Sequence, residues 1–253
     1  MKVKPYFRTT LAKPYQGQFF HPAGTSVIMN AEVSTKSVGK FIMMLPDPVS
    51  LNLNNAQNFI DKAEMLKEKI NRAKQTRVFS KILNENTIQG LSMEQIKNAD
   101  PEANIVRILN DEKVFEYIQS SMGVVVSLIT SVESFLNMII PHDYTTTRKN
   151  RKGEEETLDK EQIVRRFSIE DKIEVVAEVK NRSEIKQQKF WSSFKEVKNL
   201  RDEIIHFKRL DKKIDQMWTP IIVAFFDSDL QQYFDDIVEL INFLEPKYLE
   251  YES

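Results

Sequence analysis

The fold assignment depends on residues 195–208, which read KEVKNLRDEIIHFK. Apolar residues recur there at helical spacing, and a rotation of about 100° per residue gathers them on one broad face that should pack into a core. Arg201 projects onto that apolar face, whereas His206 projects onto the opposite, polar side. A charged group that faces a core is costly unless it is paired and hydrogen-bonded. We therefore expect Arg201 to have a specific partner or function.

A second long helix, predicted over at least 111–140, supplies the candidate partner. One side of it carries a stripe of small and polar residues at three- and four-residue spacing, which suits close helix packing or the lining of a wet cleft: Ser120, Gly123, Ser127, Thr130, Ser131, Ser134 and Asn137. Glu133 lies at the edge of this stripe, and we expect it to form an ion pair with Arg201. The alternative is ordinary helix packing with a solvated Glu133.

Residues 122–140 come closest to a membrane-spanning segment. Glu133, Asn137 and several hydroxyl side chains interrupt this apolar run. Polar and ionisable groups are costly within a bilayer, so the pattern favours a central core helix and no membrane partner.

The remaining sequence predicts a mainly α protein with a small β-containing N-terminal extension. Residues 1–53 hold three of the six glycines, five of the nine prolines and two strand-like runs, VIMNAEV and KFIMML. Asn150 and Gly153 favour a hairpin or exposed loop between residues 143 and 158. Further helices are expected over 56–84, 92–98, 168–179, 187–209 and 227–244. We divide the chain into an extension over 1–100 and a helical domain over 101–253.

Composition narrows the classes of protein that fit. The 253 residues include no cysteine, which excludes disulfides, thiolate catalysis and cysteine-ligated zinc. The net charge of −1 gives no overall attraction to nucleic acid. Residues 1–15 lack the apolar run of a secretory signal, and we expect a cytoplasmic protein. We find no metal-ligand spacing, phosphate-binding loop or serine nucleophile motif, so we expect neither a metal nor a cofactor.

The strongest local basic cluster is RKNRK, residues 148–152. Contact with RNA is one interpretation of this run. The other is a solvated tip balanced by the acids at 154–156.

Several of these pieces occur in an order that resembles a known family. A long helix with an acid (SVESFLNMII) precedes a hairpin-like insert, then SIEDKIEVV, then FWSSFKEVKNLRDEIIHFK. This order resembles the HEPN superfamily, helical domains common in prokaryotic toxin and antiviral systems. The similarity covers roughly residues 105–250 and is most specific over 165–208. The family motif is Arg, usually followed by Asn, Asp or His, then a few residues and His; Arg201, Asp202 and His206 match it.

The resemblance implies a HEPN-like helical bundle that acts as a metal-independent endoribonuclease in a homodimer. Arg201 and His206 from both chains would line one cleft, with Asp202 orienting His206. His206 would act as general base or acid, and Arg201 would hold the phosphate. The product would carry a 2′,3′-cyclic phosphate. The residues implied in RNA binding are Lys195, Lys198 and Lys208.

Two departures limit what the resemblance implies. The subgroup paired with a nucleotidyltransferase antitoxin has a tyrosine two positions after the histidine, where this chain has Lys208. Residues 1–100 lie outside the resemblance altogether. We therefore keep two hypotheses. One is a ribonuclease toxin or defence effector that has an antitoxin or regulatory protein as partner. The other is a non-catalytic HEPN-type module that dimerises or docks a partner.

Overall fold

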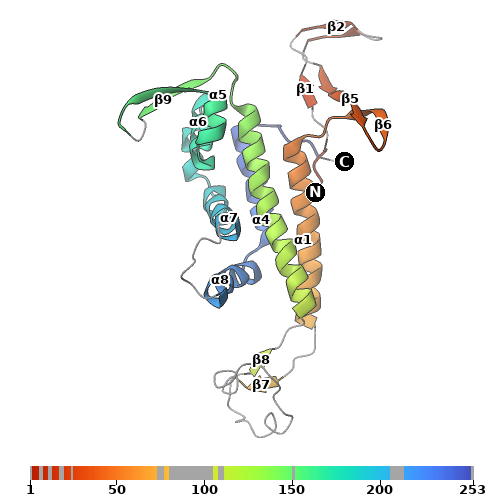
Figure 1. Cartoon of the computed structure of the whole chain (residues 1–253), viewed down its shortest axis with the longest axis vertical. Coiled ribbons are helices and arrows are strands. Elements are labelled where there is room, and N and C mark those ends of the chain that lie inside the picture. Colours follow the sequence, from red (N-terminus) through yellow and green to blue (C-terminus); the bar gives the residue numbers. More distant parts are fainter. Residues whose placement is uncertain are drawn as a thin grey trace. The chain divides into compact units, whose positions relative to one another are not determined.

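The computed structural model describes residues 2–5, 8–10, 13–16, 20–23, 25–72, 77–79, 105–107, 111–149, 152–205 and 214–251 (Figure 1). Its helices are α1 (Pro48–Arg72), α4 (Asp111–Ile139), α5 (Lys160–Arg166), α6 (Ile169–Val179), the 3₁₀ helix η1 (Ser183–Gln187), α7 (Phe190–Ile205), α8 (Ile214–Asp227) and α9 (Leu230–Leu244). The chain is mainly helical, as predicted.

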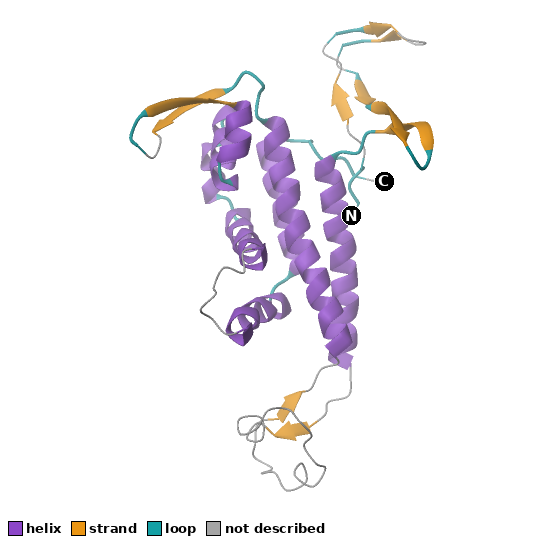
Figure 2. Cartoon of the chain, viewed as in Figure 1, coloured by secondary structure: helices purple, strands orange, loops and turns teal. Residues whose placement is uncertain are grey.

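Strands in the described ranges occur only in two-stranded antiparallel sheets (Figure 2). The pairs are β1 (Arg8–Thr10) with β4 (Ser26–Ile28), β2 (Tyr15–Gln16) with β3 (Phe20–His21), β5 (Asn30–Thr35) with β6 (Gly39–Met44), β7 (Arg77–Phe79) with β8 (Ile105–Arg107), and β9 (Thr145–Lys149) with β10 (Glu155–Asp159). The β-containing extension and the hairpin insert are therefore confirmed. Gly153 occupies the turn of the insert with a φ of 82°, a conformation that other residues rarely adopt.

Internal contacts divide the chain into two compact units. One unit combines Met1–Ile60 with Ser121–Ser253, and the other is Asp61–Ser120. The predicted boundary at residue 100 lies outside the described residues. In the smaller unit, Lys62 and Glu116 form an ion pair of 3.6 Å between its two helical stretches. Its buried side chains include Leu66, Ile70 and Tyr117.

The larger unit has a core built from helices that are far apart in the sequence. α7 packs against α9, where the rings of Phe190 and Phe243 meet edge to face at 5.6 Å. The Ser193 hydroxyl also donates a hydrogen bond to the buried carboxylate of Asp236. Fully buried apolar residues from the second half of α4, from α6, α7 and α9 complete this core, among them Phe135, Leu136, Ile173, Phe194, Val197, Ile237 and Ile241. The core therefore holds the helix that carries the Arg201 motif.

Helix starts were predicted unevenly. The helix expected over 168–179 is confirmed, with Ser168 as its cap: the Ser168 side chain accepts from Asp171 N at 3.2 Å, and the Asp171 carboxylate accepts from Ser168 N at 3.1 Å. α1 was expected to begin at residue 56, but it begins at Pro48. Asp47 caps it by accepting from Ser50 N at 3.0 Å, and proline suits a first helical position. Asn54, two residues before the predicted start, lies inside α1, and its side chain bonds the backbone of Val3.

Other element predictions need adjustment or lie outside the description. α7 begins at Phe190 rather than 187, and α9 begins at Leu230, capped by Asp229, rather than at 227. α5 and α8 were not predicted. The helix expected over 92–98 falls outside the described residues.

α4 includes a stretch whose length and composition suit a membrane crossing. Among the described residues, Glu112–Ile139 is the one such candidate. Half of its most apolar stretch is buried within the protein, and core helices of soluble proteins meet the same criteria.

Candidate functional site

Arg201 lies in the last turn of α7, at the edge of the core. Its side chain is 30% exposed, and its Nη1 lies 2.9 Å from Oδ1 of the neighbouring Asp202. One turn earlier Val197 is fully buried, but one turn later Ile205 is 48% exposed. Leu200 and Ile204 stay buried, so the core covers one side of the apolar face up to the last turn of α7. Arg201 and Ile205 lie at the exposed edge of that face, and the expectation that Arg201 points into the core is wrong.

The expected ion pair between Arg201 and Glu133 is also wrong. Oε1 of Glu133 accepts from Nζ of Lys172 at 3.2 Å, and in the described part of the chain Arg201 has Asp202 as its partner. Lys172 on α6 is almost completely buried, whereas the side chain of Glu133 is 43% exposed. A buried ammonium requires a carboxylate far more than a half-exposed guanidinium does, so Lys172 takes this partner.

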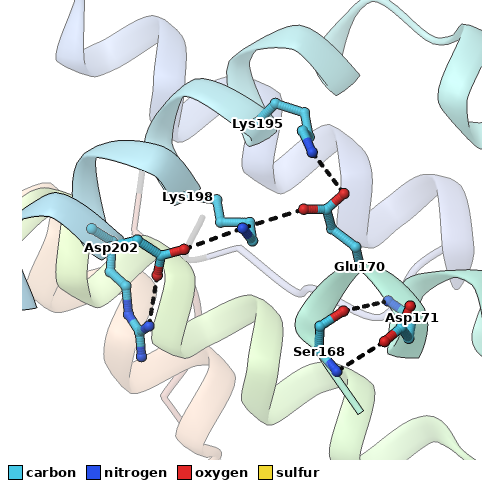
Figure 3. Close-up of polar contacts among 7 residues, drawn as sticks. Ser168, Glu170, Asp171, Lys195, Lys198 and Asp202 are labelled. Atoms are coloured by element: carbon cyan, nitrogen blue, oxygen red, sulfur yellow. Dashed lines mark hydrogen bonds and ion pairs between the residues drawn. The ribbon is translucent and has the colours of Figure 1, made fainter. Parts of the chain in front are cut away.

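A ladder of alternating charges runs from Glu170 on α6 through the lysines of α7 to Asp202 (Figure 3), and Asp202 in turn contacts Arg201. Glu170 accepts from Lys195 at 2.7 Å through Oε2 and contacts Lys198 at 3.2 Å through Oε1. Lys198 also contacts Oδ2 of Asp202 at 3.1 Å, and Asp202 contacts Arg201 through its other oxygen. We call these five residues the charge ladder. Its carboxylates and cations alternate, so each charge has an opposite neighbour.

Contacts within the charge ladder shift the pKa values of Glu170, Asp202 and Lys198. Hydrogen bonding from Lys195 lowers the pKa of Glu170 against the opposing effect of burial. Burial alone would raise the pKa of Asp202, but hydrogen bonds from Arg201 and Lys198 outweigh it and lower that pKa. Burial likewise opposes the charge of Lys198, but its bonds to Asp202 and Glu170 raise the pKa of its ammonium. All these shifts favour the charged forms.

The other predicted site residues are placed only in part. Lys195 and Lys198, expected to bind RNA, lie on α7 with their ammonium groups on Glu170. His206 and Lys208 lie outside the described residues, so the structure does not describe Asp202 orienting His206. Asp202 instead contacts Lys198 and Arg201.

Arg148 of the basic run contacts its own hairpin and α5. Its Nε lies 3.2 Å from Oε1 of Glu156, and its guanidinium lies 4.7 Å from the ring centroid of Phe167. Glu156 also holds Arg166 at 2.7 Å. These contacts favour a structural role for Arg148. Within the ranges that the structure describes, no cluster of three or more acids and histidines could hold a metal ion.

Sequence reasoning missed Glu170 and Lys172. Lys172 precedes Val175, Val176 and Val179 by three, four and seven residues, which places it on the apolar face of its helix. That spacing was a readable signal of a buried lysine. Glu170 gave no signal, because its lysine partners come from another helix.

Comparison with known proteins identifies no relative. No family model, no curated protein and no solved structure matches this chain significantly.

Proposed function

We propose that this chain is a metal-independent endoribonuclease of the HEPN type, acting as a homodimer with a composite site of Arg201 and His206. The sequence resemblance supplies the reaction class. The partly exposed guanidinium of Arg201 supports the proposal independently of that resemblance.

The non-catalytic alternative explained Arg201 as the buried partner of Glu133. Glu133 is paired with Lys172 instead, and Arg201 is 30% exposed at the end of its helix. Asp202 engages one terminal nitrogen of a guanidinium that has five N–H donors. A planar guanidinium with remaining donors suits a phosphodiester, which it can bind through two oxygens. This observation favours a ligand-binding role over a purely structural one.

In the proposed reaction, His206 removes the proton from a ribose 2′-hydroxyl, and the 2′-oxygen attacks the adjacent phosphorus. The bond to the 5′-oxygen breaks, and that leaving oxygen takes up the proton that His206 received from the 2′-hydroxyl. Arg201 stabilises the charge that builds on the phosphoryl oxygens. The products are a 2′,3′-cyclic phosphate and a 5′-hydroxyl.

A dimer resolves a geometric difficulty. In a straight helix, side chains five residues apart point about 140° from each other, so Arg201 and His206 of one chain would not meet. Two copies related by a two-fold axis can place the arginine of one chain beside the histidine of the other. Mixing Arg201→Ala chains with His206→Ala chains tests this arrangement. After exchange between equal amounts of the two variants, half of the dimers are mixed, and each mixed dimer keeps one of its two Arg201–His206 pairs. Activity should therefore rise to at most about a quarter of the wild-type activity.

The direct test is cleavage of RNA by purified protein in the presence of a chelator. His206→Ala should abolish cleavage while leaving the melting temperature and the dimer unchanged; His142→Ala, a change at an exposed histidine after α4, is the matched control. Arg201→Ala should lower kcat by about 100-fold, whereas Arg165→Ala, at a surface arginine paired with Glu161, should leave it unchanged. Wild-type protein that cuts no RNA would refute the proposal.

A cellular assay extends the same comparison. We propose that the protein is a cytoplasmic toxin or antiviral defence effector, restrained by an antitoxin or another regulatory protein. Expression of the wild type should then arrest growth, and expression of His206→Ala should not. Dimerisation without RNA cleavage or toxicity would instead support the non-catalytic module.

A further inference from the structure

We propose that Glu170 is a positioning residue of the ribonuclease site, which fixes Asp202 through Lys198 and thereby fixes the guanidinium of Arg201. This inference rests on the proposed function. It assigns a role to an acid on a different helix, outside the Arg201–His206 motif.

Glu170 is anchored by its own helix. It is the second residue of α6, two positions after the Ser168 cap, and reciprocal hydrogen bonds between Ser168 and Asp171 fix this first turn. The amino-terminal end of a helix also favours a negative charge by its exposed N–H groups. The backbone at Glu170 is therefore fixed, so its carboxylate can hold side chains of α7 in place.

The spacing of α7 matches this anchor. Lys195, Lys198 and Asp202 follow one another at three and four residues, which places them on one stripe of the helix. Each contact uses a different carboxylate oxygen: two on Glu170 for the lysines, and two on Asp202 for Lys198 and Arg201. Because each contact uses its own oxygen, the side chains connect in one order: Lys195, Glu170, Lys198, Asp202 and Arg201.

Partial burial makes the arrangement more restrictive than a surface network. The side chain of Lys198, at the centre, is only 19% exposed, and that of Glu170 is 28% exposed. Lys198 has little freedom to take another position, because it is held by one carboxylate on each side. Removal of the charge on Glu170 frees Lys198 from α6 and leaves Asp202 as its one carboxylate within the ladder. Asp202 then moves toward Lys198, and its hold on Arg201 weakens.

Glu170→Gln keeps the shape of the side chain and removes its charge. A positioning role predicts that kcat falls about 10-fold or more, since a misplacement of about 1 Å can cost about 100-fold. Binding should be unchanged or tighter, because an anion is removed beside an anionic ligand. Binding is measured with an RNA oligonucleotide carrying 2′-O-methyl groups, which lacks the attacking hydroxyl and cannot be cleaved. The matched control is Glu174→Gln, one turn later on α6 at an exposed acid paired with Lys186; its kcat should stay at the wild-type value.

A double-mutant cycle identifies the route. If Glu170 acts through Asp202, then Glu170→Gln should lower kcat much less in an Asp202→Asn background than in the wild type. The melting temperature of each variant separates a loss of folded protein from a loss of rate.

The outcomes are distinct. A reduced kcat with retained binding and non-additivity supports the positioning role. An unchanged kcat, or a fall in kcat that is fully additive with that of Asp202→Asn, overturns it while leaving the ribonuclease proposal intact. Wild-type protein that binds the methylated RNA but cleaves no unmodified RNA refutes the proposed function itself, and the positioning role with it.

Discussion

Replacing Glu133 by glutamine would leave the ammonium of Lys172 buried without a carboxylate. Removal of one partner from a fully buried ion pair costs about 3–5 kcal/mol. Lys172 is buried, but Glu133 is 43% exposed, so water that reaches Glu133 can partly solvate the ammonium. We therefore expect a smaller loss, about 2–3 kcal/mol of unfolding free energy. For a chain of this size, that corresponds to a fall in melting temperature of about 4–12 °C.

Lys172→Met provides the contrasting variant. Methionine keeps an unbranched side chain of similar length and removes the buried charge, while Glu133 can be solvated. We expect a change of less than about 1 kcal/mol, because hydrophobic replacement of a buried charge is often neutral or stabilising. In a Lys172→Met background, Glu133→Gln should cost almost nothing.

Urea denaturation of the two single variants and the double variant measures these free energies. If Lys172→Met destabilises as much as Glu133→Gln, or the two effects simply add, the assignment of this pair is refuted. Arg201→Ala supplies an internal control. Its effect should add to that of Glu133→Gln within about 0.5 kcal/mol, since Arg201 is paired elsewhere.

Three further predictions concern helix packing, capping and pH. A Cβ on Gly123 would lie 2.7 Å from the ring of Phe59, so Gly123→Ala should destabilise by about 1–3 kcal/mol in urea denaturation, and should become stabilising by about 1 kcal/mol in a Phe59→Ala background. Ser168→Ala should cost about 1 kcal/mol by the same measurement, since it removes the α6 cap; no loss would show that the capping box does not stabilise this helix. The pKa values of Glu170 and Asp202 are lowered on folding, so their stabilisation is present above their ordinary values of 4.5 and 3.8 and is lost as pH falls through the folded-state values. Glu170→Gln should therefore lose less stability than the wild type on acidification below about pH 4.5, and an identical acid response would contradict the assignment.

Local signals in the sequence predicted much of the fold. The Ser168 cap, the turn at Gly153 and the apolar periodicity of α4 each depend on neighbouring residues, so they could be recognised without tertiary information. The start of α1 was recognisable too, because Asp47-Pro48 is a helix-start signal. The start was predicted at residue 56 because that prediction relied on the apolar pattern further along the helix.

The partners of charged groups were harder to predict. The helical projection placed both Arg201 and Ile205 on an apolar face, but a projection does not show where neighbouring helices end. In the last turn of α7 Ile204 is buried while Ile205 is 48% exposed, so the core covers only part of the projected apolar face. Glu133 was assigned to Arg201 because the second buried cation, Lys172, was overlooked. Choosing between two cations requires knowing how α4 and α6 pack, which no local pattern supplies.

The side-chain amide of Asn54 holds Val3 by two hydrogen bonds, from Val3 N at 3.0 Å and to Val3 O at 2.6 Å. Val3 also bridges Tyr251, and Lys4 N donates to Glu250 O at 2.7 Å. The two ends of the described chain are thus fastened to each other beside α1. Tension applied to these ends in a pulling experiment would break the hydrogen bonds between the two paired segments one after another rather than all at once. The pairing between residues 3–4 and 250–251 should therefore break at low force, before the helices lose their packing.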